Sequence, residues 1–276
     1  MAGNDTPAAA TPRSLPSRCD VLVVGAGVAG AATALRLARA GRHVVVVEAR
    51  PFGHRPGFVH LVQRPGVVLL AQWGLLDQLY RAGVPALVRS TFWYGDHDTT
   101  VRGGPECGVE GPIVADQELL DAVLREAAQR AGVTFFDGHA LVNLRRDADG
   151  RVIGAAVVDT AGRVTEVRAP WTIGADGVDS TLAQLVRAPT QREGAYATST
   201  IAAQFEGLAV AGAQWHFRPG IAGGAMPLRG GRTLLFVTTS SRRYREQMRH
   251  DLAGGLQRGL AELSSDLVAR CRGAVR

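Results

Sequence analysis

The sequence predicts an α/β fold in which a three-layer domain with a parallel sheet is interleaved with a domain built on a mostly antiparallel sheet. Residues 19–48 have the pattern of an apolar strand, a glycine-rich turn, a helix and a second apolar strand, which is typical of a parallel βαβ unit. Residues 133–167 contain short strands separated by turns rich in Asp and Gly, which indicates an inserted β-meander. From residue 196 onward, longer strands follow one another through turns, and this favours an antiparallel sheet.

The glycine-rich turn has the G-x-G-x-x-G spacing of a dinucleotide site. Gly25 permits a tight turn, Gly27 lets a pyrophosphate approach the backbone, and Gly30 allows the helix to pack closely on the strand. Free N–H groups at the start of that helix can then bind the phosphate charge. Glu48 ends the second strand, where a carboxylate can accept hydrogen bonds from an adenosine ribose. The order of strand, turn, helix, strand and acid therefore predicts a Rossmann-like dinucleotide site rather than an ordinary βαβ turn.

The composition is that of an ordinary globular protein, with 46% hydrophobic and 20% charged residues in a chain of 276. No apolar run reaches the roughly 18 residues of a membrane-spanning helix, so no membrane span is expected. Residues 1–18 lack the apolar core of a signal peptide and are expected to form a disordered tail. The three cysteines include no C-x-x-C pair and suit a reducing compartment. These features predict a cytoplasmic protein.

The net charge of +6 does not by itself indicate a nucleic-acid partner. All 31 basic residues are arginine, which the base composition of the genome explains more simply than selection for phosphate binding. The densest cluster, between Arg242 and Arg249, has the spacing of an exposed helix face. We therefore expect no nucleic-acid partner. No His, Cys or Asp cluster has the spacing of a metal site, so no metal is expected either.

Helices are expected at residues 66–81 and 116–132, a short aromatic strand at 91–94, and loops at 49–57 and 103–111. The later strands are expected at residues 133–136, 141–144, 152–158, 164–167, 171–173, 201–205, 214–217, 225–228 and 233–238, with helical segments from 244 onward.

Residues 174–177, Gly-Ala-Asp-Gly, form a second candidate site. An Asp-Gly pair is often only a turn, and such turns are expected elsewhere in this chain. Asp176 and Gly177 differ in context, because an apolar strand precedes them and a helix follows from Ser180. At the end of a strand they can reach back to the dinucleotide.

These two motifs and the meander between them resemble the class A flavoprotein monooxygenases of p-hydroxybenzoate hydroxylase type, over about residues 19–240. Arg64-Pro65-Gly66 and the helix after it are similar to the FAD loop of that family. The resemblance implies an FAD-binding domain over residues 19–190. Residues 91–108, which lie within this range, are expected to contribute to the substrate domain instead. The substrate domain, with C-terminal helices, is expected over residues 191–276.

The resemblance also implies the chemistry. FAD would be reduced by NADH or NADPH, and O₂ would then form a flavin C4a-hydroperoxide that hydroxylates or epoxidises a small aromatic or polyketide-like substrate. The residues that the resemblance assigns to FAD are Gly25, Ala26, Gly27, Gly30, Glu48, Arg50, Arg64, Gln117, Asp176 and Gly177.

The chain departs from the family pattern at two places. Gln117 stands where the family commonly has arginine, so it can donate a hydrogen bond but brings no charge. A third family motif, a Gly-Asp pair after the substrate sheet, is not found, because Gly95-Asp96 precedes the second motif. The substrate domain is therefore expected to be incomplete. Either the sequence is truncated, or it is a non-catalytic FAD-binding fragment or pseudoenzyme.

The sequence leaves the catalytic residues and the reaction type open. His216 is a weak catalytic candidate, because on its predicted strand it faces away from Trp215 and Phe217. An FAD-dependent reductase of isoprenoid type is an alternative to the monooxygenase. A flavin halogenase is disfavoured, because its W-x-W-x-I-P stretch and its catalytic lysine are missing. Neither the substrate nor the oligomeric state follows from the sequence.

Overall fold

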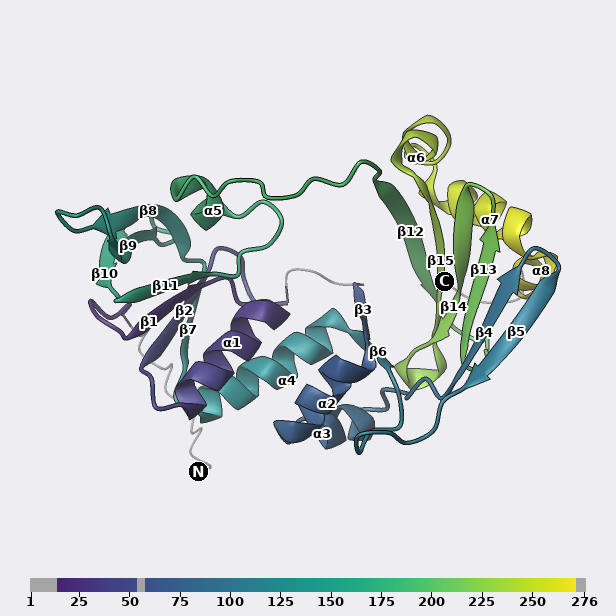
Figure 1. Ribbon diagram of the computed structural model, residues 1–276, viewed down its shortest axis with the longest axis horizontal. Helices are drawn as coiled ribbons and strands as arrows, with labels where there is room; N and C mark the ends of the chain where they lie inside the picture. The colour runs from purple at the N-terminus through teal and green to yellow at the C-terminus, as the bar shows by residue number, and fades with distance from the viewer. Residues whose placement is uncertain (1–13, 54–57, 272–276) are drawn as a thin grey trace, which may run out of the picture. The chain divides into compact units, whose positions relative to one another are not determined.

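The computed structural model describes residues 14–53 and 58–271, and the chain forms two compact units (Figure 1). Unit 1 comprises residues 1–54 and 125–188, and unit 2 comprises residues 55–124 and 189–276. The sequence predicts that only residues 91–108 leave the first domain, whereas the contacts assign all of residues 55–124 to unit 2.

The core of unit 1 is a four-stranded parallel sheet with the order β11-β1-β2-β7. Its strands are β1 (Val21–Val24), β2 (Val44–Glu48), β7 (Thr134–Asp137) and β11 (Trp171–Gly174). Side chains on both faces of β1 and β2 are buried, which explains their continuous runs of valine and leucine. β7 is expected in the meander, but it instead pairs in parallel with β2.

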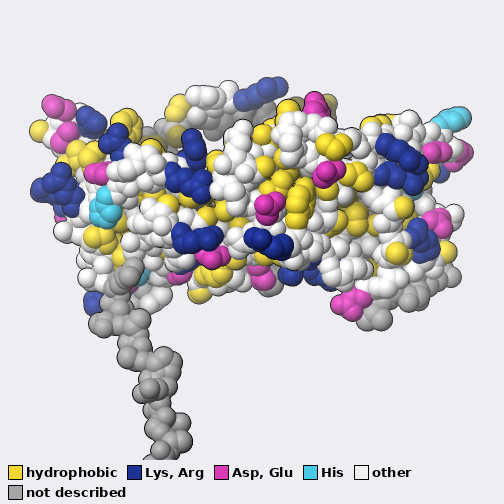
Figure 2. Space-filling view, turned by 90° about the horizontal axis from the view of Figure 1, so that it is seen from below, with side chains coloured by type: hydrophobic (Ala, Val, Ile, Leu, Met, Phe, Trp, Pro, Cys, Tyr) yellow, Lys and Arg dark blue, Asp and Glu magenta, His cyan; other side chains and the backbone are white. Residues whose placement is uncertain are grey.

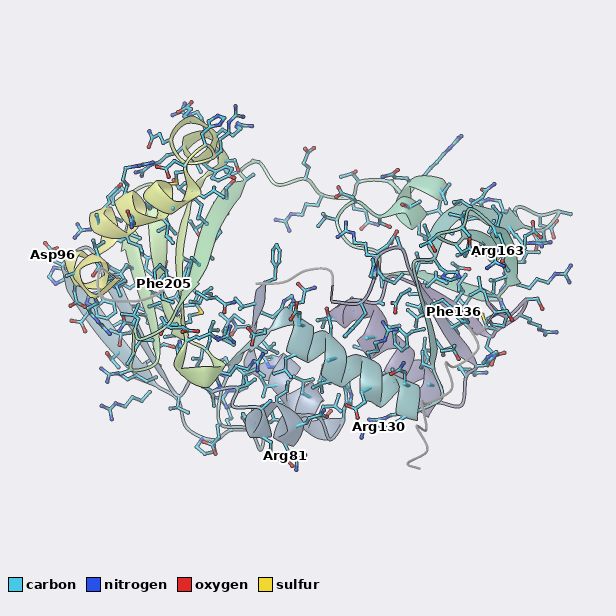
Figure 3. The ribbon with its side chains drawn as sticks, turned by 180° about the vertical axis from the view of Figure 1, so that it is seen from behind. Arg81, Asp96, Arg130, Phe136, Arg163 and Phe205 are labelled. Atoms are coloured by element: carbon cyan, nitrogen blue, oxygen red, sulfur yellow. The ribbon has the colours of Figure 1, made fainter. Side chains whose placement is uncertain are left out.

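The meander of unit 1 consists of β8 (Ala140–Arg146), β9 (Val152–Val158) and β10 (Val164–Arg168), all antiparallel. Its apolar side packs with one face of the parallel sheet in a single buried cluster that includes Phe136 (Figure 3). Helix α1 (Val28–Arg39) contacts β1 and β2, and the short helix α5 (Thr181–Leu185) contacts β8. The first residues of the expected tail lie outside the described residues, but Arg18 forms a β-bridge with Arg168.

Unit 2 is built on a six-stranded sheet with the order β12-β15-β14-β13-β4-β5. The strands are β4 (Arg89–Tyr94), β5 (His97–Arg102), β12 (Thr198–Phe205), β13 (Ala213–Arg218), β14 (Ile221–Pro227) and β15 (Thr233–Ser240). All neighbours are antiparallel except β4 and β13, which run parallel. β4 and β5 precede the other four strands in the chain, and residues 125–188 of unit 1 lie between them in the sequence.

Helices cover one face of this sheet (Figure 1). They are α6 (Ser241–Gln247), α7 (Leu252–Leu263) and α8 (Ser265–Cys271). Leu256 and Leu260 of α7 join a buried cluster with residues of β14 and β15, and Phe205 of β12 belongs to the same cluster (Figure 3). Gly259 allows this close approach, because a Cβ atom there would lie 2.6 Å from Cγ1 of Val237.

The remaining elements of unit 2 are β3 (Val59–Val62), α2 (Arg64–Gln72), α3 (Leu76–Arg81), β6 (Ile113–Asp116) and the start of α4 (Gln117–Arg130). The prediction of one helix over residues 66–81 is wrong. Gly74, with φ +74°, ends α2 by donating its N–H to the carbonyl of Ala71 at 2.9 Å, and α3 starts afresh. The β3–β6 ladder and the short helix from Arg229 to Gly231 are also not predicted from the sequence.

The arginines around α6 are partly neutralised by acids. Arg243 pairs with Glu262 at 2.5 Å, which raises the pKa of Arg243 and lowers the pKa of Glu262. Figure 2 shows basic and acidic side chains interspersed on one face of the molecule rather than a continuous basic surface there. None of the helices in residues 14–53 and 58–271 is long and apolar enough to cross a membrane.

Candidate functional site: a nucleotide cradle and an aromatic sheet face

In the glycine turn of unit 1, two glycines lie against other atoms of the protein, and a third lies beside open space. A side chain at Gly25, which has φ +101°, would collide with the backbone of Ala175. A side chain at Gly30 would collide with the carbonyl of Gly25. Gly27 has no neighbouring atom within 4 Å of its Cβ position. Packing therefore requires glycine at Gly25 and Gly30, whereas the space beside Gly27 leaves room for a ligand.

That open space lies at the N-terminus of α1. Gly27 is the N-cap residue of this helix, no side chain caps it, and its first turn contains no acidic residue. The first N–H groups of a helix have no partner within the helix and carry a partial positive charge. The turn therefore offers donors to an anion that approaches Gly27, as a pyrophosphate would.

Glu48 ties the turn to the end of β2. One carboxylate oxygen accepts a hydrogen bond from the N–H of Ala26 at 2.9 Å, and the other accepts one from the N–H of Arg50 at 3.0 Å. Each oxygen keeps a second lone pair, so the carboxylate can still accept a hydrogen bond from a ribose hydroxyl. Arg50 itself is exposed beside it.

The second motif meets the glycine turn through Ala175 rather than through the side chain of Asp176. The N–H of Ala175 bonds to the carbonyl of Val24 at 2.7 Å, and the backbone of Ala175 limits the space at Gly25. Asp176 accepts hydrogen bonds from Ser180 Oγ at 2.6 Å and from the N–H of Leu182 at 3.1 Å. Its carboxylate thus caps α5. Gly177, the next residue, is exposed with φ +88°.

Arg64 and Gln117 both belong to unit 2 and make contacts there. Arg64 donates hydrogen bonds to the carbonyls of Gly104 at 3.3 Å, Glu106 at 3.4 Å and Val109 at 3.0 Å. It therefore holds the loop after β5. Gln117 begins α4, and its Nε2 donates to Oδ2 of Asp121 at 3.3 Å. Contacts of these two residues with FAD stay predictions.

His216 lies on the face of the unit 2 sheet that the helices cover. It is 6% exposed and stacks on Trp93, with ring centroids 4.4 Å apart. Its Nε2 has no hydrogen-bond partner among the described residues. Burial, with a smaller contribution from Arg218, lowers the pKa of His216, so the ring is neutral at pH 7. This position is typical of a core residue and does not favour a catalytic role.

The opposite face of the same sheet carries a row of aromatic rings. Trp215 stacks in parallel with Phe92 at 6.4 Å and meets Phe236 edge-on at 5.4 Å. Tyr94 and Phe217 form a second stacked pair at 5.1 Å. Tyr94 is exposed and the other rings are half-buried, and Trp215 and Phe236 pack partly against a buried cluster that includes Met226 and Leu234.

A cluster of charged residues in unit 2 was not foreseen. Asp116, at the end of β6, accepts hydrogen bonds from Arg229 Nε at 2.5 Å and from Arg232 Nη2 at 3.2 Å. No signal in the sequence links these residues, because more than a hundred positions separate the acid from the arginines.

The parallel sheet, the glycine turn and the acid at the end of β2, interleaved with an antiparallel sheet, define an FAD-binding oxidoreductase of mixed α/β fold. Residues 18–250 match the family model described as "FAD binding domain", and the chain belongs to that family. The predicted fold class and the resemblance to class A flavin monooxygenases are thereby confirmed.

Known proteins with related sequences include both reductases and oxygenases. The menaquinone reductase of Mycolicibacterium smegmatis is 36% identical over 188 residues, which cover 65% of this chain and 42% of that protein. The kynurenine 3-monooxygenase of Salinispora arenicola is 35% identical over 175 residues, which cover 59% of this chain and 37% of that protein. This chain therefore matches about two fifths of the length of these relatives.

A solved structure of similar fold is that of PqsL, described as a probable FAD-dependent monooxygenase from Pseudomonas aeruginosa. It superposes with a TM-score of 0.76 at 21% identity, covering 92% of this chain and 70% of that one. At this level of identity the likeness supports the fold alone.

Proposed function

We propose that this chain supports an NAD(P)H-dependent monooxygenation of a small aromatic or polyketide-like molecule. The observation that carries the proposal is the open space at Gly27, next to uncapped N–H groups of α1 and a carboxylate at Glu48. These residues fit the pyrophosphate and ribose of FAD. Bound FAD would supply the redox chemistry, namely acceptance of hydride from NADH or NADPH and activation of O₂.

The aromatic face of unit 2 supports the substrate class. Trp215, Phe92 and Phe236 present ring surfaces against which a flat apolar molecule can stack. A relative named as a kynurenine 3-monooxygenase supports oxygen insertion as the reaction. A panel of aromatic compounds is therefore the starting point for finding the substrate.

A second candidate is an FAD-dependent reductase of isoprenoid type, which the similarity to a menaquinone reductase favours. One experiment separates the two. The purified protein is supplied with FAD, NADPH or NADH, and either ¹⁸O₂ with aromatic compounds or menaquinone without oxygen. Incorporation of ¹⁸O into a product supports the monooxygenase. A gain of two hydrogens at a double bond of the isoprenoid side chain of menaquinone, rather than at the quinone ring, supports the reductase, and FAD retention with neither product contradicts both.

A further inference from the structure

The guanidinium group of Arg125, on α4, contacts three side chains of unit 1 at once. Its Nη1 and Nη2 donate to the two carboxylate oxygens of Asp137 at 2.9 Å and 2.6 Å. Its Cζ lies 4.8 Å from the ring centroid of Phe52 and 4.6 Å from that of Phe135. A planar guanidinium can form a bidentate pair and stack on aromatic rings at the same time. Arg125 therefore joins β7, which contains Phe135 and Asp137, to the loop after β2, which contains Phe52.

The two segments that Arg125 joins are also the ones that hold Glu48. In the loop after β2, the N–H of Arg50 donates to Oε1 of Glu48 at 3.0 Å. After β7, the N–H of His139 donates to the carbonyl of Glu48 at 2.9 Å. Asp137 lies opposite Glu48 in the register of β2 and β7. The loop thus orients the carboxylate of Glu48, and the end of β7 holds its main chain.

The far end of the loop after β2 depends on Arg125. Residues 51–53 exchange no hydrogen bond with any other described residue, and Phe52 is 48% exposed. The contact of the Phe52 ring with Arg125 therefore provides the specific interaction that fixes this end of the loop. The Arg125 side chain, in contrast, is only 13% exposed and held by Asp137. A loop with few contacts opens easily, and a ligand that needs it closed loses affinity in ordering it.

We propose that Arg125 is a positioning residue for the nucleotide site. By holding Phe52 and Asp137 together, it keeps the loop after β2 and the end of β7 in the positions that orient the carboxylate of Glu48. Arg125 acts on the nucleotide only through that carboxylate. The inference rests on the part of the proposed function that assigns the ribose of FAD to Glu48, and not on the reaction that FAD performs.

The test is a calorimetric titration of the full chain with FAD, combined with thermal unfolding of each variant without cofactor. Phe52→Leu should weaken FAD binding about threefold, the scale of a lost cation–π contact. Because Phe52 is exposed, the melting temperature should change by less than about 3 °C. Arg125→Met should weaken FAD binding about tenfold, since it removes the bidentate pair as well, and Arg125→Lys, which keeps a cation beside the rings, should restore part of the loss. Arg130→Met, at a side chain 62% exposed on the same helix, is the matched control and should change nothing (Figure 3).

A double-mutant cycle shows whether the effect passes through Glu48. If it does, neither Phe52→Leu nor Arg125→Met weakens FAD binding further in a chain that already carries Glu48→Ala. A structural role of Arg125 that is independent of Glu48 would instead weaken FAD binding equally in both backgrounds. The cycle therefore separates positioning of the carboxylate from a general loss of stability.

Unaltered FAD binding by either Phe52→Leu or Arg125→Met, or equal losses with and without Glu48, would overturn the inference and leave the proposed function intact. If the unaltered chain binds no FAD, or if Glu48→Ala alone leaves the affinity unchanged, the inference and the assignment of FAD to this site both fail. If FAD binding follows the expected pattern but no ¹⁸O from ¹⁸O₂ enters a product, only the proposed function fails.

Discussion

Substitutions at Gly25 and Gly27 should separate stability from cofactor binding. Both glycines belong to one turn, but a side chain at Gly25 meets the backbone of Ala175, whereas a side chain at Gly27 meets nothing within 4 Å. We therefore expect Gly25→Ala to destabilise the fold. Gly27→Val should leave the fold intact and abolish FAD retention, because its side chain would occupy the space that the pyrophosphate needs.

The structure gives the size of the difference. An alanine at φ +101° costs about 1–2 kcal/mol in backbone strain. Relief of the overlap with Ala175 costs about 1–3 kcal/mol more. A total of about 3 kcal/mol lowers the melting temperature by roughly 6–12 °C. Gly27 has φ −68°, which valine adopts freely, so the change in stability should stay within about 1 kcal/mol, the scale of an altered N-cap.

The assay is thermal unfolding by circular dichroism without cofactor, combined with the flavin absorbance that remains after gel filtration with FAD. Retention of FAD by Gly27→Val at the level of the unaltered protein would show that the pyrophosphate does not lie at this turn. A loss of stability in Gly27→Val as large as that in Gly25→Ala would show that the space beside Gly27 is not open.

Three further substitutions test the charged and titratable groups. Glu48→Ala should weaken FAD binding by about 1–3 kcal/mol, measured by calorimetry, and an unchanged affinity would place the ribose elsewhere. The pKa of His216 in the folded protein is lowered from its ordinary value of 6.5. As the pH falls, this histidine is therefore protonated in the unfolded chain before it is protonated in the folded protein. The free energy of unfolding in urea should therefore fall as the pH drops below about 6.5, and His216→Leu should reduce this slope. Arg125→Met should lower stability by about 2–3 kcal/mol, because it leaves the half-buried carboxylate of Asp137 without its bidentate partner. The exposed control Arg163→Met should cost no more than about 1 kcal/mol in the same unfolding experiment, and equal losses would contradict the role of burial.

The βαβ unit that carries the glycine turn and Glu48 could be predicted because its parts lie close together in sequence. From Gly25 to Glu48, each turn, helix and strand has its own local signature, and the structure reproduces it almost residue for residue. The prediction of one helix over residues 66–81 is wrong, and the reason is also local. Its apolar spacing continues through Gly74, but a glycine with φ +74° ends the helix, and spacing does not report φ.

What the sequence determined by itself was the βαβ unit, the alternation of strands and turns, and the family to which they belong, because these depend on neighbours along the chain. Only the tertiary structure decided that β7 joins the parallel sheet and that the side chain of Asp176 binds the start of α5 rather than the glycine turn. It also decided that Asp116 meets Arg229 and that His216 lies under the helices. These outcomes depend on contacts between residues far apart in the chain. The free energy of such contacts comes from burial and charge pairing in three dimensions. The spacing of residues along the sequence does not show which distant residues make these contacts.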